Sequence, residues 1–137
     1  MKTILPFVVL CAAVLTVVTS QSCASRSNGC SIPYNLPYFF KTRFTPSCDK
    51  HDVCYECASY YGRTKNDCDG MLFNGANRVC SSMRKRFIVS VLTAAEKEFC
   101  KAISLSYYEA VSHFGGSHFP SSSASWCSQS WVRSCMP

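Results

Sequence analysis

A histidine and an aspartate stand side by side in the segment Cys48-Asp49-Lys50-His51-Asp52-Val53-Cys54-Tyr55. Histidine is the side chain best suited to move a proton near neutral pH, and an aspartate carboxylate is a hard oxygen ligand that suits calcium. If the segment is helical, neighbouring side chains point about 100° apart. His51 and Asp52 can then face two halves of one site, with a base in one half and a metal ion in the other.

A second carboxylate can reach His51 from a neighbouring helix. A bridge between Cys54 and Cys68 would join two helices one turn from His51, and Asp69 would then point across the gap at the imidazole. A carboxylate that accepts a hydrogen bond from one ring nitrogen fixes the tautomer and leaves the other nitrogen free as a base. Tyr55 lies four residues after His51 on the same face, where its hydroxyl can hold Asp69 in place.

Asp52 alone cannot complete a calcium site. It supplies one or two oxygens, whereas calcium takes about six to eight, many of them from carbonyl groups and water. The other protein oxygens must come from a loop. The segment Asn28-Gly29-Cys30 is the candidate, because a bridge between Cys30 and Cys48 would bring it close to the helix.

Residues 1–20 read as a secretory signal peptide. Lys2 precedes an almost wholly apolar run from Ile4 to Val18, and small residues follow at the expected cleavage point. The run is short for a membrane-spanning helix. Removing it leaves 117 residues with ten cysteines, which indicates five disulfides in a single secreted, extracellular domain, residues 21–137.

The mature segment carries 13 basic and eight acidic side chains. This charge suits anionic surfaces such as lipid headgroups, acidic glycans or nucleic acid, and charge alone does not choose among them. Nothing besides charge indicates nucleic acid, so no nucleic-acid partner is expected. The aromatic and basic residues at 38–43 fit either a buried core or a surface that lies on a membrane interface, and both interpretations stay open.

Three helices are expected to position these residues. Prolines at 33, 37 and 46 predict an ordered loop over Cys30 to Pro46. Pro46 then predicts the entry to a first helix from Ser47 to Tyr61, which ends at Gly62.

Asp67 is expected to cap a second helix from Cys68 to Ser82, weakened by its glycines and antiparallel to the first because the turn between them is short. The capping-box pattern Thr93-Ala94-Ala95-Glu96 predicts the start of a third helix, which ends at Gly115-Gly116. Its inward face is expected to carry Phe99, Ile103, Ala110, Val111 and Phe114. The predicted fold is a small all-α, disulfide-rich domain with two antiparallel catalytic helices and a third C-terminal helix.

The same residues also allow simpler interpretations. An adjacent histidine and aspartate usually form an ion pair on a helix surface, and Cys54-x-x-Cys57 is also the spacing of half a zinc site or a redox pair. The convergence of the flanking cysteines, Tyr55 and Asp69 on one geometry favours a proton-transfer site. The basic stretch from Met83 to Arg86 is either a solvated helix end or a site of proteolytic processing.

The motif Cys48-x-x-His51-Asp52-x-Cys54-Tyr55 resembles the active-site helix of secreted phospholipases A2. The preceding loop, Asn28-Gly29-Cys30-Ser31-x-Pro33, is similar to that of the compact branch, which includes bacterial enzymes and the conodipines of cone-snail venom. The stretch from Cys30 to Thr42 points to conodipines in particular. The resemblance covers roughly residues 28–80.

The resemblance implies calcium-dependent hydrolysis of the sn-2 ester of glycerophospholipids at a membrane surface, giving fatty acid and lysophospholipid, as a venom component. His51 would be the base that activates water, and Asp69 would orient it. Asp52, the Asn28 side chain and the Gly29 carbonyl would bind Ca²⁺. The alternative is a phospholipase-like toxin that acts by binding a receptor or channel and has no use for the catalytic residues.

The chain departs from these relatives in two ways. The glycine-rich calcium loop of the larger animal and snake-venom enzymes is missing, and Asn28 stands where bacterial relatives carry Asp, which predicts weaker calcium binding. Conodipines are also two disulfide-linked chains cut from one precursor. Residues 21–86 hold seven cysteines and residues 87–137 hold three, so full pairing requires an odd number of bridges between them, one of them from Cys57 or Cys80.

Overall fold

The computed structural model describes residues 21–31, 39–83 and 90–137, without the side chains of 90–93. These ranges contain the helices α1 (Lys41–Cys57), α2 (Lys65–Ser81) and α3 (Ser90–Phe114), the short 3₁₀ helices η1 (Cys23–Arg26), η2 (Gly115–His118), η3 (Ser125–Ser128) and η4 (Ser130–Cys135), and no strand. The predicted small all-α, disulfide-rich fold is confirmed. The predicted signal peptide and residues 84–86 of the predicted processing site lie outside the described ranges.

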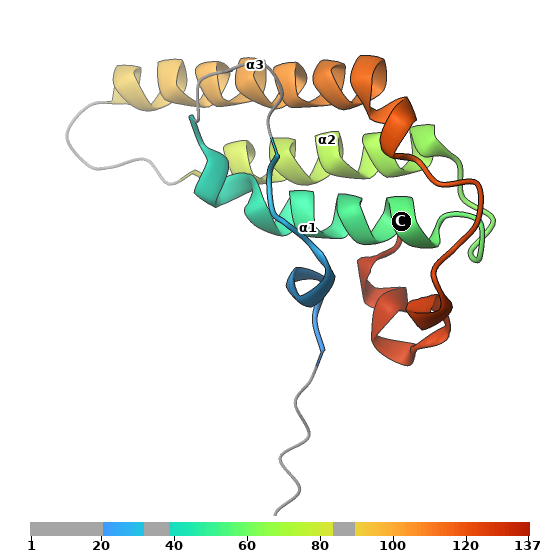
Figure 1. Ribbon diagram of the computed structural model, residues 1–137. Coiled ribbons are helices and arrows are strands. Elements are labelled where there is room, and N and C mark those ends of the chain that lie inside the picture. The colour runs from blue at the N-terminus through green and yellow to red at the C-terminus, as the bar shows by residue number, and fades with distance from the viewer. Residues whose placement is uncertain (1–20, 32–38, 84–89) are drawn as a thin grey trace, which may run out of the picture.

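Successive long helices run in opposite directions. α2 lies between α1 and α3 and is antiparallel to both, as Figure 1 shows. η1 lies beside α1, and the C-terminal segment with η4 folds back against α1 and η1. No helix in the described ranges combines the length and the apolar character needed to cross a bilayer.

α1 begins earlier than the sequence predicts. It starts at Lys41, so the predicted loop ends before this point and Pro46 lies inside the helix. Proline removes one internal hydrogen bond, but the first turns of α1 bury Phe44 completely, with its ring 5.3 Å from that of Tyr107 and edge-on to it. Packing against the rest of the molecule therefore outweighs the local effect of the proline.

The turn between α1 and α2 also differs from the prediction. α1 ends at Cys57, and a turn continues to Gly62, whose positive φ of 62° suits glycine. α2 begins at Lys65 and is capped by Thr64, not by Asp67. Asp67 is instead the third residue of the helix, where its carboxylate accepts a hydrogen bond from the Thr64 backbone N–H over 2.8 Å and completes a capping box.

α3 ends at Phe114 before Gly115 as predicted, but it begins at Ser90, before the predicted capping box. Its inward face was only partly predicted. Phe99 and Phe114 are 44% and 55% exposed, and the buried positions of α3 include Cys100, Ser104, Tyr107 and Ala110. The face is rotated from the prediction because the bridge from Cys80 to Cys100 turns Cys100 inward.

All ten cysteines of the described residues are paired. Two predicted bridges, Cys30–Cys48 and Cys54–Cys68, are present. Three others, Cys23–Cys135, Cys57–Cys127 and Cys80–Cys100, join the segment before residue 84 to the segment after residue 89. The predicted odd number is confirmed, and Cys54 and Cys57 are excluded as a zinc or redox pair because each is bonded to a different partner.

The aromatic residues of the C-terminal segment and those just before α1 have different surroundings. Trp126 and Trp131 stack 5.6 Å apart and pack against a buried cluster that includes Val53 and Val132, so they cover core. Phe40 packs against the main core, whereas Phe39 is 51% exposed. Tyr34 and Tyr38 lie outside the described residues.

Candidate active site

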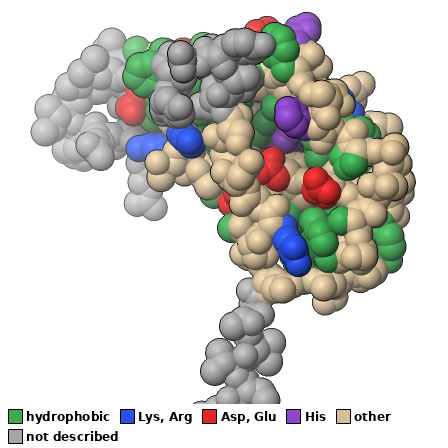
Figure 2. Space-filling view, in the orientation of Figure 1, with side chains coloured by type: hydrophobic (Ala, Val, Ile, Leu, Met, Phe, Trp, Pro, Cys, Tyr) green, Lys and Arg blue, Asp and Glu red, His purple; other side chains and the backbone are tan. Residues whose placement is uncertain are grey.

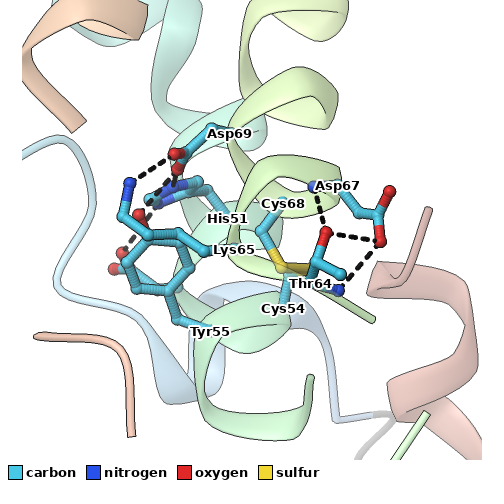
Figure 3. Close-up of a disulfide and its surroundings, with 9 residues drawn as sticks. His51, Cys54, Tyr55, Thr64, Lys65, Asp67, Cys68 and Asp69 are labelled. Carbon is cyan, nitrogen blue, oxygen red and sulfur yellow. Dashed lines mark hydrogen bonds and ion pairs between the residues drawn. A yellow bond between two sulfur atoms is a disulfide. The ribbon is translucent and has the colours of Figure 1, made fainter. Parts of the chain in front are cut away.

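His51 and Asp69 come from two helices that the Cys54–Cys68 bridge ties together (Figure 3). The His51 Nε2 atom lies 2.9 Å from Asp69 Oδ1, and both residues are buried, with exposed fractions of 6% and 1%. This is the contact that the spacing of the two cysteines predicts.

Asp69 accepts hydrogen bonds from two further side chains (Figure 3). The Tyr55 hydroxyl donates to Oδ1 over 2.6 Å, as expected from its position on α1, and the Lys65 ammonium donates to Oδ2 over 2.6 Å. Burial alone would raise the pKa of Asp69, but the hydrogen bonds from His51, Lys65 and Tyr55 outweigh burial and lower the pKa below its usual 3.8. Asp69 is therefore ionised at neutral pH and acts only as an acceptor.

An ionised Asp69 determines which ring nitrogen of His51 carries the hydrogen. Because the carboxylate only accepts, Nε2–H donates to it, and in the neutral ring Nδ1 keeps its lone pair. Nδ1 faces the other carboxylate, 3.9 Å from Asp52 Oδ1. Burial on its own lowers the pKa of the imidazole, but hydrogen bonds and negative charge from Asp52 and Asp69 outweigh it and raise the pKa above 6.5.

Asp52 lies where the N-terminal segment meets α1. Its Oδ2 atom accepts a hydrogen bond from the Ser27 hydroxyl over 2.8 Å and one from the Asn28 backbone N–H over 3.3 Å. Gly29 follows with a φ of 73°, a conformation that turns the chain and favours glycine. The Cys30–Cys48 bridge anchors this loop to α1, so Asn28, Gly29 and Asp52 are brought together as predicted.

The Asn28 amide group gives a direct test of whether these residues fit a cation. The amide position nearest to Asp52 lies 3.1 Å from Asp52 Oδ2 and 3.2 Å from the Gly29 carbonyl oxygen. An amide can be turned either way. With the nitrogen in this position the amide donates to both oxygens. With the oxygen there, it accepts a hydrogen bond from the Ser31 hydroxyl over 2.9 Å and lies beside the Asp52 and Gly29 oxygens. Such a set of hard oxygen donors fits calcium.

These residues line one pocket of about 790 Å³, within the range of roughly 300–1,000 Å³ that small-molecule sites occupy. Figure 2 shows acidic side chains and histidines close together on this face of the molecule. The apolar part of the lining comes mainly from α2 and α3 and includes Leu72, Tyr107, Ala110, Val111 and Phe114. The pocket thus has an apolar wall next to the polar site of His51 and Asp52.

Two participants were not expected from the sequence. Lys65 stands four residues before Asp69, the spacing of an ion pair on one helix face. Recognition of Thr64-Lys65-Asn66-Asp67 as a capping box would have placed Lys65 on the helix and revealed this pair. The hydroxyl of Ser27 reaches Asp52 across 25 positions of sequence, and no local pattern signals that contact.

Comparison with known proteins identifies relatives of this chain by sequence. No family model and no solved structure matches the sequence. Conodipine-P2 and Conodipine-P1 of Conus purpurascens are each 36% identical to it over 69 residues, which is 50% of this chain and 38% of the length of each relative. The Conodipine-M alpha chain of Conus magus is 34% identical over 64 residues, or 46% of this chain and 80% of that one. Since the match spans most of the Conodipine-M alpha chain, this chain belongs to the conodipine family.

Proposed function

We propose that this protein is a secreted, calcium-dependent phospholipase A2 that hydrolyses the sn-2 ester of glycerophospholipids, as a component of venom. The observation that carries the proposal is the buried His51–Asp69 pair, which leaves His51 Nδ1 directed toward Asp52 in an open pocket. The likeness of the motif around His51 to that of secreted phospholipases A2, together with membership of the conodipine family, supports the same reaction.

In the proposed reaction His51 is the general base. Nδ1 takes a proton from a water molecule as that water attacks the ester carbonyl, and the imidazolium that forms keeps its Nε2–H directed at Asp69. Asp69 stabilises this positive charge because it is itself ionised. Tyr55 and Lys65 do not touch the substrate in this scheme but hold the carboxylate in place.

Asp52, the Asn28 side-chain oxygen and the Gly29 carbonyl are the residues that would hold calcium. A bound calcium ion supplies Lewis-acid stabilisation of negative charge on the ester oxygen and the phosphate. The Asn28 amide is expected to present its oxygen to the ion, and its nitrogen to Asp52 when the ion is absent.

The pocket and the charge of the chain agree with a lipid substrate. The apolar wall formed by Leu72, Ala110 and Val111 can receive an acyl chain beside the base. An excess of basic side chains favours approach to an anionic membrane surface. Fatty acid and lysophospholipid are the expected products.

The test of the activity is release of fatty acid from phosphatidylcholine vesicles. With calcium present we expect release that stops on addition of a chelator and falls by about 10²–10⁴-fold in His51→Gln, because the general base is lost. His113→Gln is the matched control, since His113 is exposed and does not line the pocket. No release by the wild type with calcium would overturn the proposal and leave a non-enzymatic toxin.

Calcium binding can be tested without any activity assay. An ion that binds only the folded chain stabilises it, by about 2.7 kcal/mol at a concentration one hundred times its dissociation constant. We expect calcium to raise the melting temperature of the wild type and of Glu98→Gln, whose carboxylate lies on the surface of α3. Asp52→Asn should lose the effect, and an equal rise in all three proteins would place the ion elsewhere.

A further inference from the structure

Lys65 joins three groups from two helices. Its ammonium donates to Asp69 Oδ2 over 2.6 Å, to the Val111 carbonyl over 2.8 Å and to the Ser112 carbonyl over 3.2 Å. An ammonium group has three N–H bonds, so every one of them has an acceptor. The side chain is 21% exposed, which leaves little room for it to move away.

The two carbonyls belong to the last turn of α3, which ends at Phe114. The last four carbonyls of a helix have no partner within the helix and carry the negative end of its dipole. Lys65 therefore caps the end of α3 with the same group that pairs with Asp69. The position of α3 and the position of the Asp69 carboxylate are therefore coupled through the Lys65 Nζ atom.

The chain just after α3 packs on the same cluster. A Cβ atom at Gly115 would lie 2.5 Å from the Tyr55 hydroxyl and 3.4 Å from Lys65 Cε. The Lys65 ammonium also lies 5.9 Å from the centre of the Tyr55 ring. The end of α3 and Gly115 therefore pack directly against Tyr55 and Lys65, two of the side chains that bond to Asp69.

Lys65 bonds to a different oxygen of Asp69 from the other described donors. His51 and Tyr55 both bond to Oδ1, and Lys65 is the donor to Oδ2 among the described residues. A carboxylate held at one oxygen can rotate about its last bond, for which side-chain preferences are broad. A donor on the second oxygen stops that rotation and keeps Oδ1 aimed at the imidazole.

We propose that Lys65 is a positioning residue for the His51–Asp69 pair, and that it works by fixing Asp69 Oδ2 to the C-terminal end of α3. The inference rests on the proposed hydrolase function and goes beyond it, because it makes the orientation of the base depend on α3. A purely structural tie between α2 and α3 would use the two carbonyls and would have no need of the carboxylate.

The kinetic test compares Lys65→Met, which keeps the length of the side chain but removes its charge and its donors, with Lys65→Arg, which keeps both. Misplacement of a reacting group costs up to about 100-fold in rate. We expect kcat on a monomeric short-chain phosphatidylcholine to fall by about 10- to 100-fold in Lys65→Met with KM unchanged, and to recover in Lys65→Arg. Lys101→Met is the control, because Lys101 pairs with Glu98 on the exposed side of α3.

A second readout is independent of turnover. The ring N–H of His51 that bonds to Asp69 should give a downfield ¹H signal that is absent in His51→Gln. We expect this signal to shift or broaden in Lys65→Met and to stay in place in Lys101→Met. If Lys65→Met does not fold, Lys65→Gln replaces it, because its amide can still donate to the Val111 carbonyl.

The outcomes separate the two proposals. A wild type that does not hydrolyse phospholipid removes the proposed function, and the ¹H signal still decides the role of Lys65. A wild type that is active, with kcat and the ¹H signal unchanged in Lys65→Met, overturns the positioning role alone. Loss of kcat that Lys65→Arg does not restore also overturns it, since the charge would then not be the reason.

Discussion

Asp69 is a charged side chain with an exposed fraction of only 1%. A buried charge is tolerated when it is paired and fully hydrogen-bonded, and His51, Tyr55 and Lys65 supply donors to both of its oxygens. The same bonds that make burial possible hold the carboxylate rigid. At the scale of single residues, stability and the proposed catalysis therefore depend on the same hydrogen bonds.

Asp69→Asn should lower stability in a pH-dependent way. The folded pKa of Asp69 lies below its usual 3.8, so its ionised form stabilises the wild type fully above about pH 3.8, and this contribution is lost as the pH falls through the lowered folded pKa. We expect the variant to be less stable by about 3–5 kcal/mol near neutral pH, and the difference to shrink below pH 3.8. Thermal unfolding with chelator present measures it.

Among the described residues, the Asp67 carboxyl in the capping box also has a lowered pKa, so it titrates in the same acidic range. Asp67 is present in both proteins, so its titration cancels in the comparison. A difference between wild type and Asp69→Asn that stays constant down to strongly acidic pH would show that Asp69 is not ionised in the folded protein.

Among the elements, α2 shows how neighbouring helices change the role of a glycine. The two glycines inside it weaken a helix by intrinsic propensity alone. A Cβ atom at Gly70 would meet nothing within 4 Å, whereas one at Gly75 would lie 2.5 Å from Ser47 Oγ and 3.1 Å from Ser47 Cβ on α1. Gly75 is therefore needed for the close approach of α1 and α2, and Gly70 is not.

Gly70→Ala and Gly75→Ala are expected to have opposite effects on the free energy of unfolding. Gly70→Ala should stabilise the protein by about 0.5–1 kcal/mol, since alanine is the better helix former. Gly75→Ala should destabilise it by about 1–3 kcal/mol through overpacking against Ser47. Chemical denaturation of both variants measures the two changes.

Ser47→Ala supplies the control for this pair. Combined with Gly75→Ala it removes the closest atom and should recover part of the lost stability, which a double-mutant cycle would detect. Equal stabilisation by the two glycine substitutions would contradict the packing that places α1 against α2.

For the whole molecule, the disulfides decide which parts stay together. α1 and α2 lie before residue 84, and α3 and the C-terminal segment follow residue 89. The bridges Cys23–Cys135, Cys57–Cys127 and Cys80–Cys100 join the two parts at separate places. The end of α3 therefore stays bound beside Lys65 even when the chain between the parts is cut.

Cleavage after Arg86 is expected to give two pieces that separate only on reduction. Mass spectrometry of the cleaved protein should show one species, heavier than the uncut chain by one water. Reduction should release pieces with seven and three cysteines. Release of either piece without a reductant would contradict the three connecting bridges, and the uncut chain, which stays one species after reduction, is the control.

Local spacing was enough to anticipate one half of the site. The spacing of His51 and Tyr55 follows from helical periodicity, and the bridges Cys54–Cys68 and Cys30–Cys48 close short loops of 14 and 18 positions, so the contacts of His51 with Asp69 and of Asn28 with Asp52 could be anticipated. Helix boundaries were harder to predict from the sequence. Pro46 argued against the first turns of α1, and only the burial of Phe44 overrides it.

The groups that hold Lys65 beside Asp69 depend on tertiary packing, which local spacing does not predict. Lys65 meets the carbonyls of Val111 and Ser112 across 46 and 47 positions, and Ser27 meets Asp52 across 25. Such contacts depend on how α3 and the N-terminal segment pack, and this is set by buried surface and by bridges such as Cys80–Cys100 rather than by any periodicity. Local spacing specifies which side chains share one helix face, whereas packing of distant segments specifies which second partner each of them finds.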